Sequence, residues 1–290
     1  MKTGLVLEGG ALRGVFTCGI LDCFQENGIN FPYVIGVSAG GGNALNFVSR
    51  QKHRTFDVAV PHKEHPYFGM RRFFQCGKIL DLDRMFYEYP FDQYPLDFDT
   101  YFASSVETEF VAVNCDSGCA EYLSERSDKH RLLTIGKASC SVPIMCKPVE
   151  LDGAHYLDGS VANAVPFNRA FERGCDRAVV IMTKKGNESA TDYKKYSLLL
   201  SLLYKKKYPK LYDLLMHRKE SYDKEIESLN KNAQEGRILL IRPETESVKK
   251  FDKDMEKLEN FYSHGYEFAQ KHLDDIRNFV DGKQVHFIGQ

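Results

Sequence analysis

Glycine is unevenly distributed in this 290-residue chain, and its concentration at the start constrains the fold more than any other feature. Ten of the 22 glycines lie within the first 50 residues. Glycine adopts backbone conformations that other residues avoid, so this cluster indicates tight turns or close approaches of the backbone to a ligand. The glycines separate two apolar runs, 3–7 and 33–35, from helix-like segments at 14–27 and 39–49. The series strand–helix–strand–helix predicts a parallel α/β architecture.

Further segments extend this pattern along the chain. Residues 129–139 and 252–280 have apolar side chains at helical spacing, and the second of these helices is expected to pack on the sheet or to cap it. Gly28 and Gly282 follow predicted helices, where glycine commonly ends a helix. Residues 51–100 are rich in aromatic residues and prolines, which predicts helical pieces and loops. Three more apolar runs predict buried strands, at 108–113, 178–182 and 237–241.

Charge and composition exclude several classes of protein. Lys and Arg number 39 against 40 Asp and Glu, and the resulting formal charge of −1 argues against a general nucleic-acid binder. The N-terminal apolar run is interrupted by Glu8 and is too short for a signal peptide, and the run 197–203 is too short to span a membrane. We therefore expect a cytoplasmic protein. The eight cysteines lack zinc-binding spacing, so we expect reduced core residues and no metal.

The pentapeptide Gly36-Val37-Ser38-Ala39-Gly40 fits the G-x-S-x-G pattern of a nucleophile elbow. It lies between a predicted strand and a predicted helix, which is the context that the pattern requires. The turn is sharp and needs small neighbours, and the helix N-terminus behind the serine favours a developing negative charge. The alternative interpretation is an ordinary turn between a strand and a helix.

A second glycine-rich loop, Gly9-Gly10-Ala11-Leu12-Arg13-Gly14, also joins a predicted strand to a predicted helix. Backbone amides in such a loop can hold a phosphate or an oxyanion. The Walker pattern is absent because Val15-Phe16 follow the loop, and Glu8 occupies the first glycine position of a dinucleotide fingerprint. The loop is therefore predicted to form an oxyanion hole for a serine nucleophile.

A third motif, Asp158-Gly159-Ser160, follows the stretch 151–157. Because Asp-Gly is a common hairpin dipeptide, the motif by itself favours a plain turn. Beside the two glycine-rich loops, it becomes a candidate for a catalytic carboxylate.

Together these motifs resemble the patatin-like phospholipase family, in particular its bacterial cytosolic members. The ordered series G-G-x-x-R-G, G-x-S-x-G and a distant Asp-Gly pair matches that family, and residues 137–149 resemble its approach to the catalytic aspartate. The resemblance covers roughly residues 3–185. It implies a three-layer α/β/α catalytic domain with a mainly parallel sheet, followed by a mostly helical region, 186–290, that packs on or caps the domain and contributes a strand near 237–242.

The resemblance also implies a Ser–Asp dyad rather than a triad. In this dyad Ser38 is the nucleophile, Asp158 is the base that activates it, and no cofactor takes part. Many family members have a glycine where this chain has Ala11, and Gly or Ala where it has Ser160. Both replacements are small and remove no proposed catalytic group. The residues assigned by resemblance to the oxyanion hole are Gly9, Gly10, Ala11, Arg13, which supports the loop, and Gly14.

A histidine-based triad of the α/β-hydrolase type is the alternative mechanism. Such hydrolases need several strands before the elbow, whereas Ser38 lies within 40 residues of the start. The candidate bases occupy no distinctive motif, and His155 is interpreted as an ordinary turn residue. The candidates are His217, His264, His272 and His286.

Residues 193–219 contain eight Lys or Arg and one acidic residue, for a net charge of +7, whereas residues 1–192 and 220–290 each sum to −4. Leucines are interleaved with the lysines. One interpretation is an amphipathic surface that contacts anionic lipid headgroups. The other is a pair of helices whose leucines pack on the core while the lysines are solvated.

Three functions remain open on the sequence alone. The leading hypothesis is hydrolysis of lipid acyl esters, and the others are hydrolysis of small soluble esters or thioesters and binding of lipid or protein without catalysis. The intact nucleophile, oxyanion and acid motifs disfavour the third. The region 60–100 is expected to shape the pocket or a lid, with Phe73, Phe74 or Phe86 affecting acyl-chain preference.

Overall fold

The computed structural model describes residues 1–60, 67–69, 74, 79–186 and 188–283, so Phe73 and His286 lie outside the described residues. The centre of the fold is an eight-stranded sheet, made of β1 (Thr3–Leu7), β2 (Tyr33–Val37), β3 (Glu107–Asn114), β4 (Ala120–Leu123), β5 (Val149–Leu151), β6 (Ala154–Asp158), β7 (Arg177–Ile181) and β8 (Ile238–Ile241).

Hydrogen-bonded strands follow the series β5-β6-β3-β2-β1-β7-β8, in which β6 and β2 pair with successive parts of β3. The strand β4 also pairs with β3. Neighbouring strands from β3 to β8 in this order are parallel, while β4, β5 and β6 pair antiparallel. The sheet is therefore mixed with a parallel centre. The predicted strand near 237–242 is confirmed as β8, which pairs with β7 and joins the C-terminal region to the sheet.

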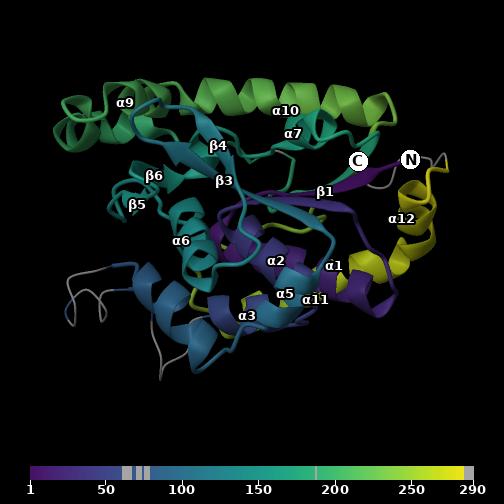
Figure 1. The fold of residues 1–290 in the computed structure, drawn as a ribbon. Helices are drawn as coiled ribbons and strands as arrows, with labels where there is room; N and C mark the ends of the chain where they lie inside the picture. The colour runs from purple at the N-terminus through teal and green to yellow at the C-terminus, as the bar shows by residue number, and fades with distance from the viewer. Residues whose placement is uncertain (61–66, 70–73, 75–78, 187, 284–290) are drawn as a thin grey trace.

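Helices cover both faces of the sheet, as Figure 1 shows. Along β1, Leu5 and Leu7 belong to the apolar core on one face and Val6 to the core on the other, because successive side chains of a strand point to opposite faces. Burial on both faces explains why the strands are continuously apolar. This confirms the three-layer α/β/α prediction. One face is covered by α1 (Gly14–Glu26), α2 (Ala39–Val48), α6 (Lys129–Ser139) and α11 (Met255–Lys271), the other by α7 (Phe167–Glu172) and α10 (Arg218–Gln234).

The other described helices are short. No described helix is long and apolar enough to cross a membrane. Between residues 51 and 100 the described residues form short helical pieces and irregular chain, as predicted. The short α-helices are α3 (Arg54–Ala59), α5 (Phe98–Ala103), α8 (Ser197–Leu200), α9 (Pro209–Met216) and α12 (Leu273–Val280).

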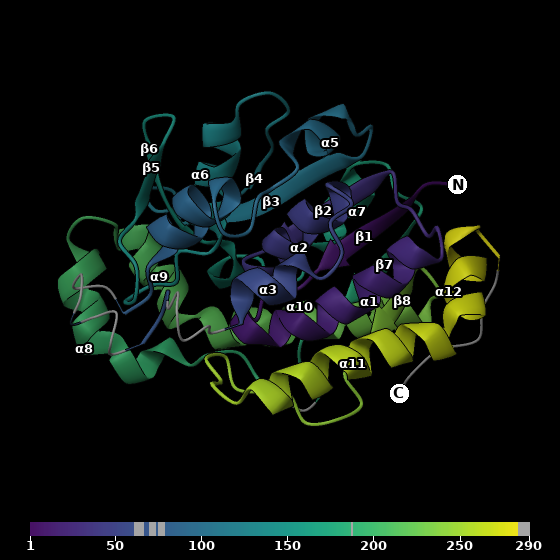
Figure 2. The same ribbon diagram turned by 90° about the horizontal axis from the view of Figure 1, so that it is seen from below.

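The continuous helix predicted for 252–280 is wrong, because the chain turns at His272 between α11 and α12. Neither glycine nor proline lies at this break, so a prediction from apolar spacing alone extends one helix across it. The turn lets Ile276 and Phe279 enter the same core as Phe268. The first part, α11, lies along α1 (Figure 2).

Two glycines allow α11 to approach α1 closely. A side chain at Gly19 of α1 would clash with the backbone of Tyr262, and one at Gly265 of α11 would clash with the carbonyl of Phe16. The C-terminal region is therefore packed against a helix that covers the sheet.

The strand β3 brings the ends of β2 and β6 together. Backbone amides along a strand alternate between its two edges, and the amides of Glu107 and Cys115, eight residues apart, donate to Pro32 before β2 and to His155 of β6. Both strands thus lie along one edge of β3 and run toward each other. Their last residues, Val37 and Asp158, pair with adjacent residues of β3. The residue after β2 is Ser38, so this pairing places Ser38 next to Asp158.

Candidate active site

Ser38 occupies a strained turn between β2 and α2. Its backbone has φ 54° and ψ −122°, in a region that non-glycine residues rarely adopt. A side chain at Gly36 would clash with the carbonyl of Gly40, and one at Gly40 would clash with the carbonyl of Leu7. Both glycines of the pentapeptide are therefore needed for α2 to pack against the strand ends.

The hydroxyl of Ser139 holds this turn in place. The Ser38 amide donates to the Ser139 hydroxyl oxygen at 2.9 Å, and that hydroxyl donates to the Val111 carbonyl of β3 at 2.7 Å. Ser139 is fully buried at the end of α6. Its side chain thus links the serine turn to the strand that positions both Ser38 and Asp158.

Asp158 ends β6 and is buried, with 2% of its surface exposed. The hairpin before it turns at Asp152 and Gly153, both at positive φ, so the Asp158-Gly159 pair is not the hairpin turn. The amide of Ser160 donates to the Asp158 carboxylate at 2.8 Å. A side chain at Gly159 would clash with the carbonyl of Val111, which explains the small residue after the aspartate.

The environment of Asp158 favours its protonated form. Burial raises the pKa of Asp158 above the ordinary aspartate value. Hydrogen bonds from Ser160 and Ser38 and the positive charge of Lys250 oppose this rise without cancelling it. The carboxyl therefore binds a proton at less acidic pH than an exposed aspartate does.

The loop after β1 presents three unpaired amides beside Ser38. Among the described residues no acceptor receives the amide hydrogens of Gly9, Gly10 or Ala11, whereas the amide of Glu8 on one side is bonded. A side chain at Gly9 would come within 3.0 Å of the Ser38 Cβ, so the loop backbone lies directly against the serine. Ala11 has φ 52°, a conformation in which glycine is least strained.

Glu8 anchors this loop from behind. The Thr183 amide donates to the Glu8 carboxylate at 2.7 Å, and the Thr183 hydroxyl lies 2.9 Å from both that carboxylate and the Gly9 carbonyl. The Lys184 ammonium lies 3.1 Å from Glu8. Burial would raise the pKa of Glu8, but Lys184 and the bonds from Thr183 outweigh it, so the pKa lies below its ordinary value. The ionised carboxylate therefore fixes the loop.

Arg13 and Gly14 connect the loop to its surroundings. The Arg13 guanidinium forms an ion pair with Glu188 at 2.8 Å and donates to the Val248 carbonyl at 3.0 Å. It is thus placed to hold the loop against the C-terminal region rather than to contact an oxyanion. Gly14 begins α1, and its carbonyl accepts from the Asn43 side chain of α2 at 3.0 Å.

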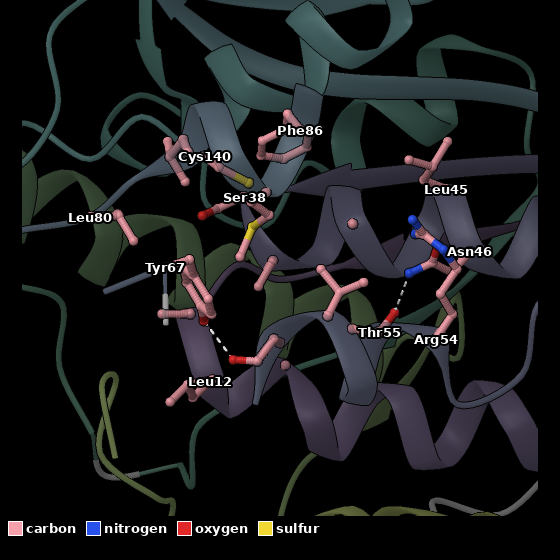
Figure 3. A pocket seen from close by; sticks show the side chains of 18 of the residues that line it. Leu12, Ser38, Leu45, Asn46, Arg54, Thr55, Tyr67, Leu80, Phe86 and Cys140 are labelled. Carbon is pink, nitrogen blue, oxygen red and sulfur yellow. Dashed lines mark hydrogen bonds between the residues drawn. The ribbon is translucent and has the colours of Figure 1, made fainter. Parts of the chain in front are cut away.

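Two pockets meet at Ser38, and the first of them is apolar (Figure 3). In Figure 3, Ser38 and Cys140 lie at one end of this apolar pocket and the buried polar cluster of Asn46, Arg54 and Thr55 at the other. Most of the wall between them is aliphatic or aromatic. Its lining includes Leu12, Leu45, Val58, Tyr67, Leu80, Leu82, Met85, Phe86, Leu133, Val142 and Phe251.

Two of the aromatic residues expected to affect acyl-chain preference, Phe86 and Phe74, differ in their position relative to the apolar pocket. Phe86 lines the pocket and is 7% exposed, whereas the side chain of Phe74 is 80% exposed. An effect of Phe86 on acyl-chain preference stays a prediction, and this side chain lies in the wall of the apolar pocket. The proposed lid falls partly outside the described residues.

Residues 5–171 match the family model of patatin-like phospholipases, which covers more than half of the chain. The chain belongs to the patatin-like phospholipase family. The matched part contains the loop after β1, the serine turn and Asp158. A second family model, a domain of unknown function (DUF6363), matches residues 208–281.

Curated relatives of this patatin-like chain include bacterial and yeast proteins. It is 32% identical over 188 residues to the uncharacterized protein YjjU of Escherichia coli (strain K12), covering 63% of this chain and 52% of YjjU. It is 24% identical over 310 aligned residues to lysophospholipase NTE1 of Candida glabrata, covering 99% of this chain and 17% of NTE1. For lysophospholipase NTE1 of Saccharomyces cerevisiae the identity is 25% over 182 residues, covering 59% of this chain and 10% of that protein. The chain thus spans about half the length of YjjU and less of the yeast proteins.

Among solved structures, VipD from Legionella pneumophila is similar with a TM-score of 0.47 and 14% identity. The similarity covers 94% of this chain and 67% of VipD.

Several residues of this patatin-like site are absent from the sequence predictions. Ser139 and Cys140 lie within the stretch that resembles the family's approach to its aspartate, so that stretch was the available signal. The Cys140 side chain interacts with Ser38, and burial together with the charge of Asp158 raises the pKa of its thiol. Cys140 is therefore a neutral and weakly nucleophilic thiol beside Ser38.

The histidines considered for a triad lie elsewhere. Among the described residues, no histidine lines either pocket at Ser38. His217 is exposed beside Asp213, while the His264 ring accepts from the Glu244 amide, and His272 separates α11 from α12. The geometry thus brings Asp158, and no described histidine, to Ser38.

Proposed function

We propose that this chain is a serine acyl hydrolase that cleaves lipid acyl esters through a Ser38–Asp158 dyad and an acyl-enzyme intermediate. The observation that carries the proposal is the meeting of three groups at one point. Ser38, in its strained turn, lines both the apolar pocket and the second pocket. The buried Asp158 carboxyl and the three unpaired amides of the loop after β1 lie in the second pocket with Ser38.

The chemistry follows from these positions. Asp158 accepts the proton of Ser38 as the Ser38 oxygen attacks the ester carbonyl carbon, and the amides of Gly9, Gly10 and Ala11 bind the resulting oxyanion. Each well-placed oxyanion donor contributes on the order of 3 kcal/mol. Collapse of the intermediate releases the alcohol, which takes its proton from Asp158. Water then attacks the acyl-enzyme with Asp158 again as base, and the fatty acid leaves as the Ser38 oxygen takes the proton back from Asp158.

Two features support a lipid substrate over a small soluble one. The pocket beside Ser38 is lined mainly by apolar side chains, which matches an acyl chain. The two yeast relatives are lysophospholipases by name, and this supports the same class of ester here.

A panel of long-chain lysophospholipids, short soluble esters and short thioesters tests the proposal. We expect hydrolysis of long-chain lysophospholipids, with a kcat/KM above that for short soluble esters or thioesters. Higher kcat/KM for short thioesters would favour the soluble-substrate alternative. Folded protein that binds lipid and hydrolyses none of the panel would favour the non-catalytic alternative.

Contact with a membrane surface is part of the proposal. Ten described large hydrophobic residues are exposed, and five of them lie between residues 196 and 203. Leu198 and Leu202 are each 78% exposed, while Leu200, Leu211 and Leu215 of the same basic segment are buried. Both interpretations of residues 193–219 therefore apply in part. Apolar side chains flanked by lysines fit an anionic lipid surface. The exposed members are Tyr196, Leu198, Leu199, Leu202 and Leu203.

Flotation with vesicles containing anionic lipid tests this surface. We expect wild-type protein to float with the vesicles, and the double change Leu198→Asp and Leu202→Asp to abolish flotation. Changing Lys205, Lys206 and Lys207 to Gln should weaken it, because each lysine near an anionic surface contributes about 1 kcal/mol. Lys224→Gln with Lys271→Gln, on other exposed surfaces, is the charge control. Equal flotation of all variants would eliminate this membrane surface.

A further inference from the structure

The second pocket at Ser38 is cationic, and its positive side chains come from outside the matched patatin-like segment. This cationic pocket shares Ala11, Ser38, Val142 and Phe251 with the apolar pocket. It also contains Asp158 and the loop after β1. An ester whose acyl chain fills the apolar pocket, with its carbonyl at Ser38, therefore directs its alcohol portion into the cationic pocket. Its cations are Lys184, Arg218 and Lys250, and two acidic residues, Glu8 and Asp158, also line it.

Arg218 is a buried cation that forms no ion pair with a described residue. It is 5% exposed, and its Nη1 is buried with no hydrogen-bond partner among the described residues. No described carboxylate lies within 4.0 Å of its guanidinium. The guanidinium carbon lies 5.0 Å from the ring of Tyr222, and the nearby Glu225 carboxylate accepts from the amides of Ala164 and Val165. A buried, unpaired guanidinium is costly to keep, which indicates that it serves a bound anion.

The two lysines differ from Arg218 in their partners. Lys184 is held by Glu8 at 3.1 Å and by the Tyr222 hydroxyl at 2.6 Å. Lys250 donates to the Thr191 hydroxyl at 2.8 Å. Burial and the positive charges of Lys184 and Arg13 lower the pKa of Lys250. Lys184 and Arg13 thus repel Lys250, and an anion bound beside Lys184 and Lys250 would relieve this repulsion.

The segment that carries Lys250 is bonded to the catalytic loop. The Leu12 amide donates to the Lys250 carbonyl at 3.1 Å, and Arg13 donates to Val248. Phe251 then forms part of the wall of both pockets. Arg218 and Lys250 both belong to residues 208–281, matched as a domain of unknown function.

We propose that this C-terminal region completes the active site by supplying Arg218 and Lys250, which with Lys184 bind a phosphate group on the alcohol side of the scissile ester. A guanidinium and ammonium groups together suit phosphate oxygens, since the guanidinium donates in a planar fork and an ammonium acts as a compact charge. The inference rests on the proposed hydrolase function and narrows its substrate to phosphate-bearing acyl esters.

A matched pair of soluble substrates tests the assignment. Monobutanoylglycerol and monobutanoylglycerol 3-phosphate share the ester and the short chain, so neither needs a membrane. We expect wild-type protein to prefer the phosphorylated ester. Arg218→Gln and Lys250→Gln should each lower kcat/KM for that ester by roughly ten- to a hundredfold and lower it less for the neutral ester, so that the preference for the phosphorylated ester falls. Lys219→Gln, an exposed neighbour with the same charge change, should alter neither.

Binding of inorganic phosphate, followed as a rise in the melting temperature, gives a readout independent of turnover. We expect phosphate to raise Tm of the wild type and not of Arg218→Gln, and to raise Tm of a second variant, Lys250→Gln, less than that of the wild type. If the protein hydrolyses both esters equally well and phosphate does not raise its Tm, the proposed phosphate site is wrong and the hydrolase function still stands. A phosphate effect on Tm without hydrolysis would support the pocket and overturn the function. A phosphate effect with equal turnover of both esters would support an anion site but overturn its assignment to the substrate.

Discussion

Replacing Asp158 with Asn should lower turnover of acyl esters by roughly a thousandfold or more, because it removes the group that we propose accepts the Ser38 proton. The amide has the shape of the carboxyl and keeps an oxygen for the Ser160 amide, which donates to Asp158 at 2.8 Å. The loss should therefore be one of catalysis and not of folding. Steady-state kinetics of the two proteins on a neutral ester measure the effect.

The same substitution should leave stability unchanged or increased at neutral pH. Burial raises the pKa of Asp158 in the folded protein, so the folded state binds the proton more tightly than the unfolded state. The stability contribution of this group is therefore present at low pH and is lost as pH rises through the raised pKa. An uncharged Asn avoids that loss. Wild-type kcat/KM should fall on the acid side with a midpoint above the ordinary aspartate pKa of about 3.9. Retained turnover in Asp158→Asn would remove Asp158 as the base.

Replacing Gly40 with Ala should destabilise the fold by about 2 kcal/mol or more, because the added methyl clashes with the carbonyls of Leu7 and Glu8. Relief of that clash moves α2 away from β1 and moves Ser38 with it, so activity should fall further than stability. Thermal unfolding and esterase assays on the same preparation measure both effects.

Gly42, two residues further along the same helix, provides a matched control. A methyl there meets no atom within 4 Å, so Gly42→Ala should raise stability by up to about 1 kcal/mol through helix propensity. Similar stability changes in the two variants would mean that α2 does not depend on close contact at Gly40.

Much of the fold around Ser38 and the loop after β1 can be predicted from the sequence because the signals that specify it are local. Buried parallel strands are continuous apolar runs, and glycines mark the turns that follow β1 and β2, so their elements agree with prediction to within a few residues. The proximity of Ser38 and Asp158 depends on both β2 and β6 lying along one edge of β3. Strand pairing across such a distance has no local signal, and only the family resemblance suggests it.

The less predictable features are set by tertiary packing. The turn at His272 has no glycine or proline and serves to direct Ile276 and Phe279 into the core. Arg218 lies in a lysine-rich segment where an exposed cation is the ordinary expectation, yet it is buried beside the active site. Spacing along one helix cannot distinguish a solvated cation from one enclosed by other elements.

Covalent labelling tests the central claim, that Ser38 is the nucleophile, most directly. Wild-type protein is incubated with a fluorophosphonate at neutral pH and the adduct is located by mass spectrometry of its peptides, with Ser38→Ala of equal melting temperature as the control. A single adduct on Ser38, absent from the Ser38→Ala protein, is the predicted result. Folded wild-type protein that stays unlabelled, or an adduct that persists in Ser38→Ala, would contradict it.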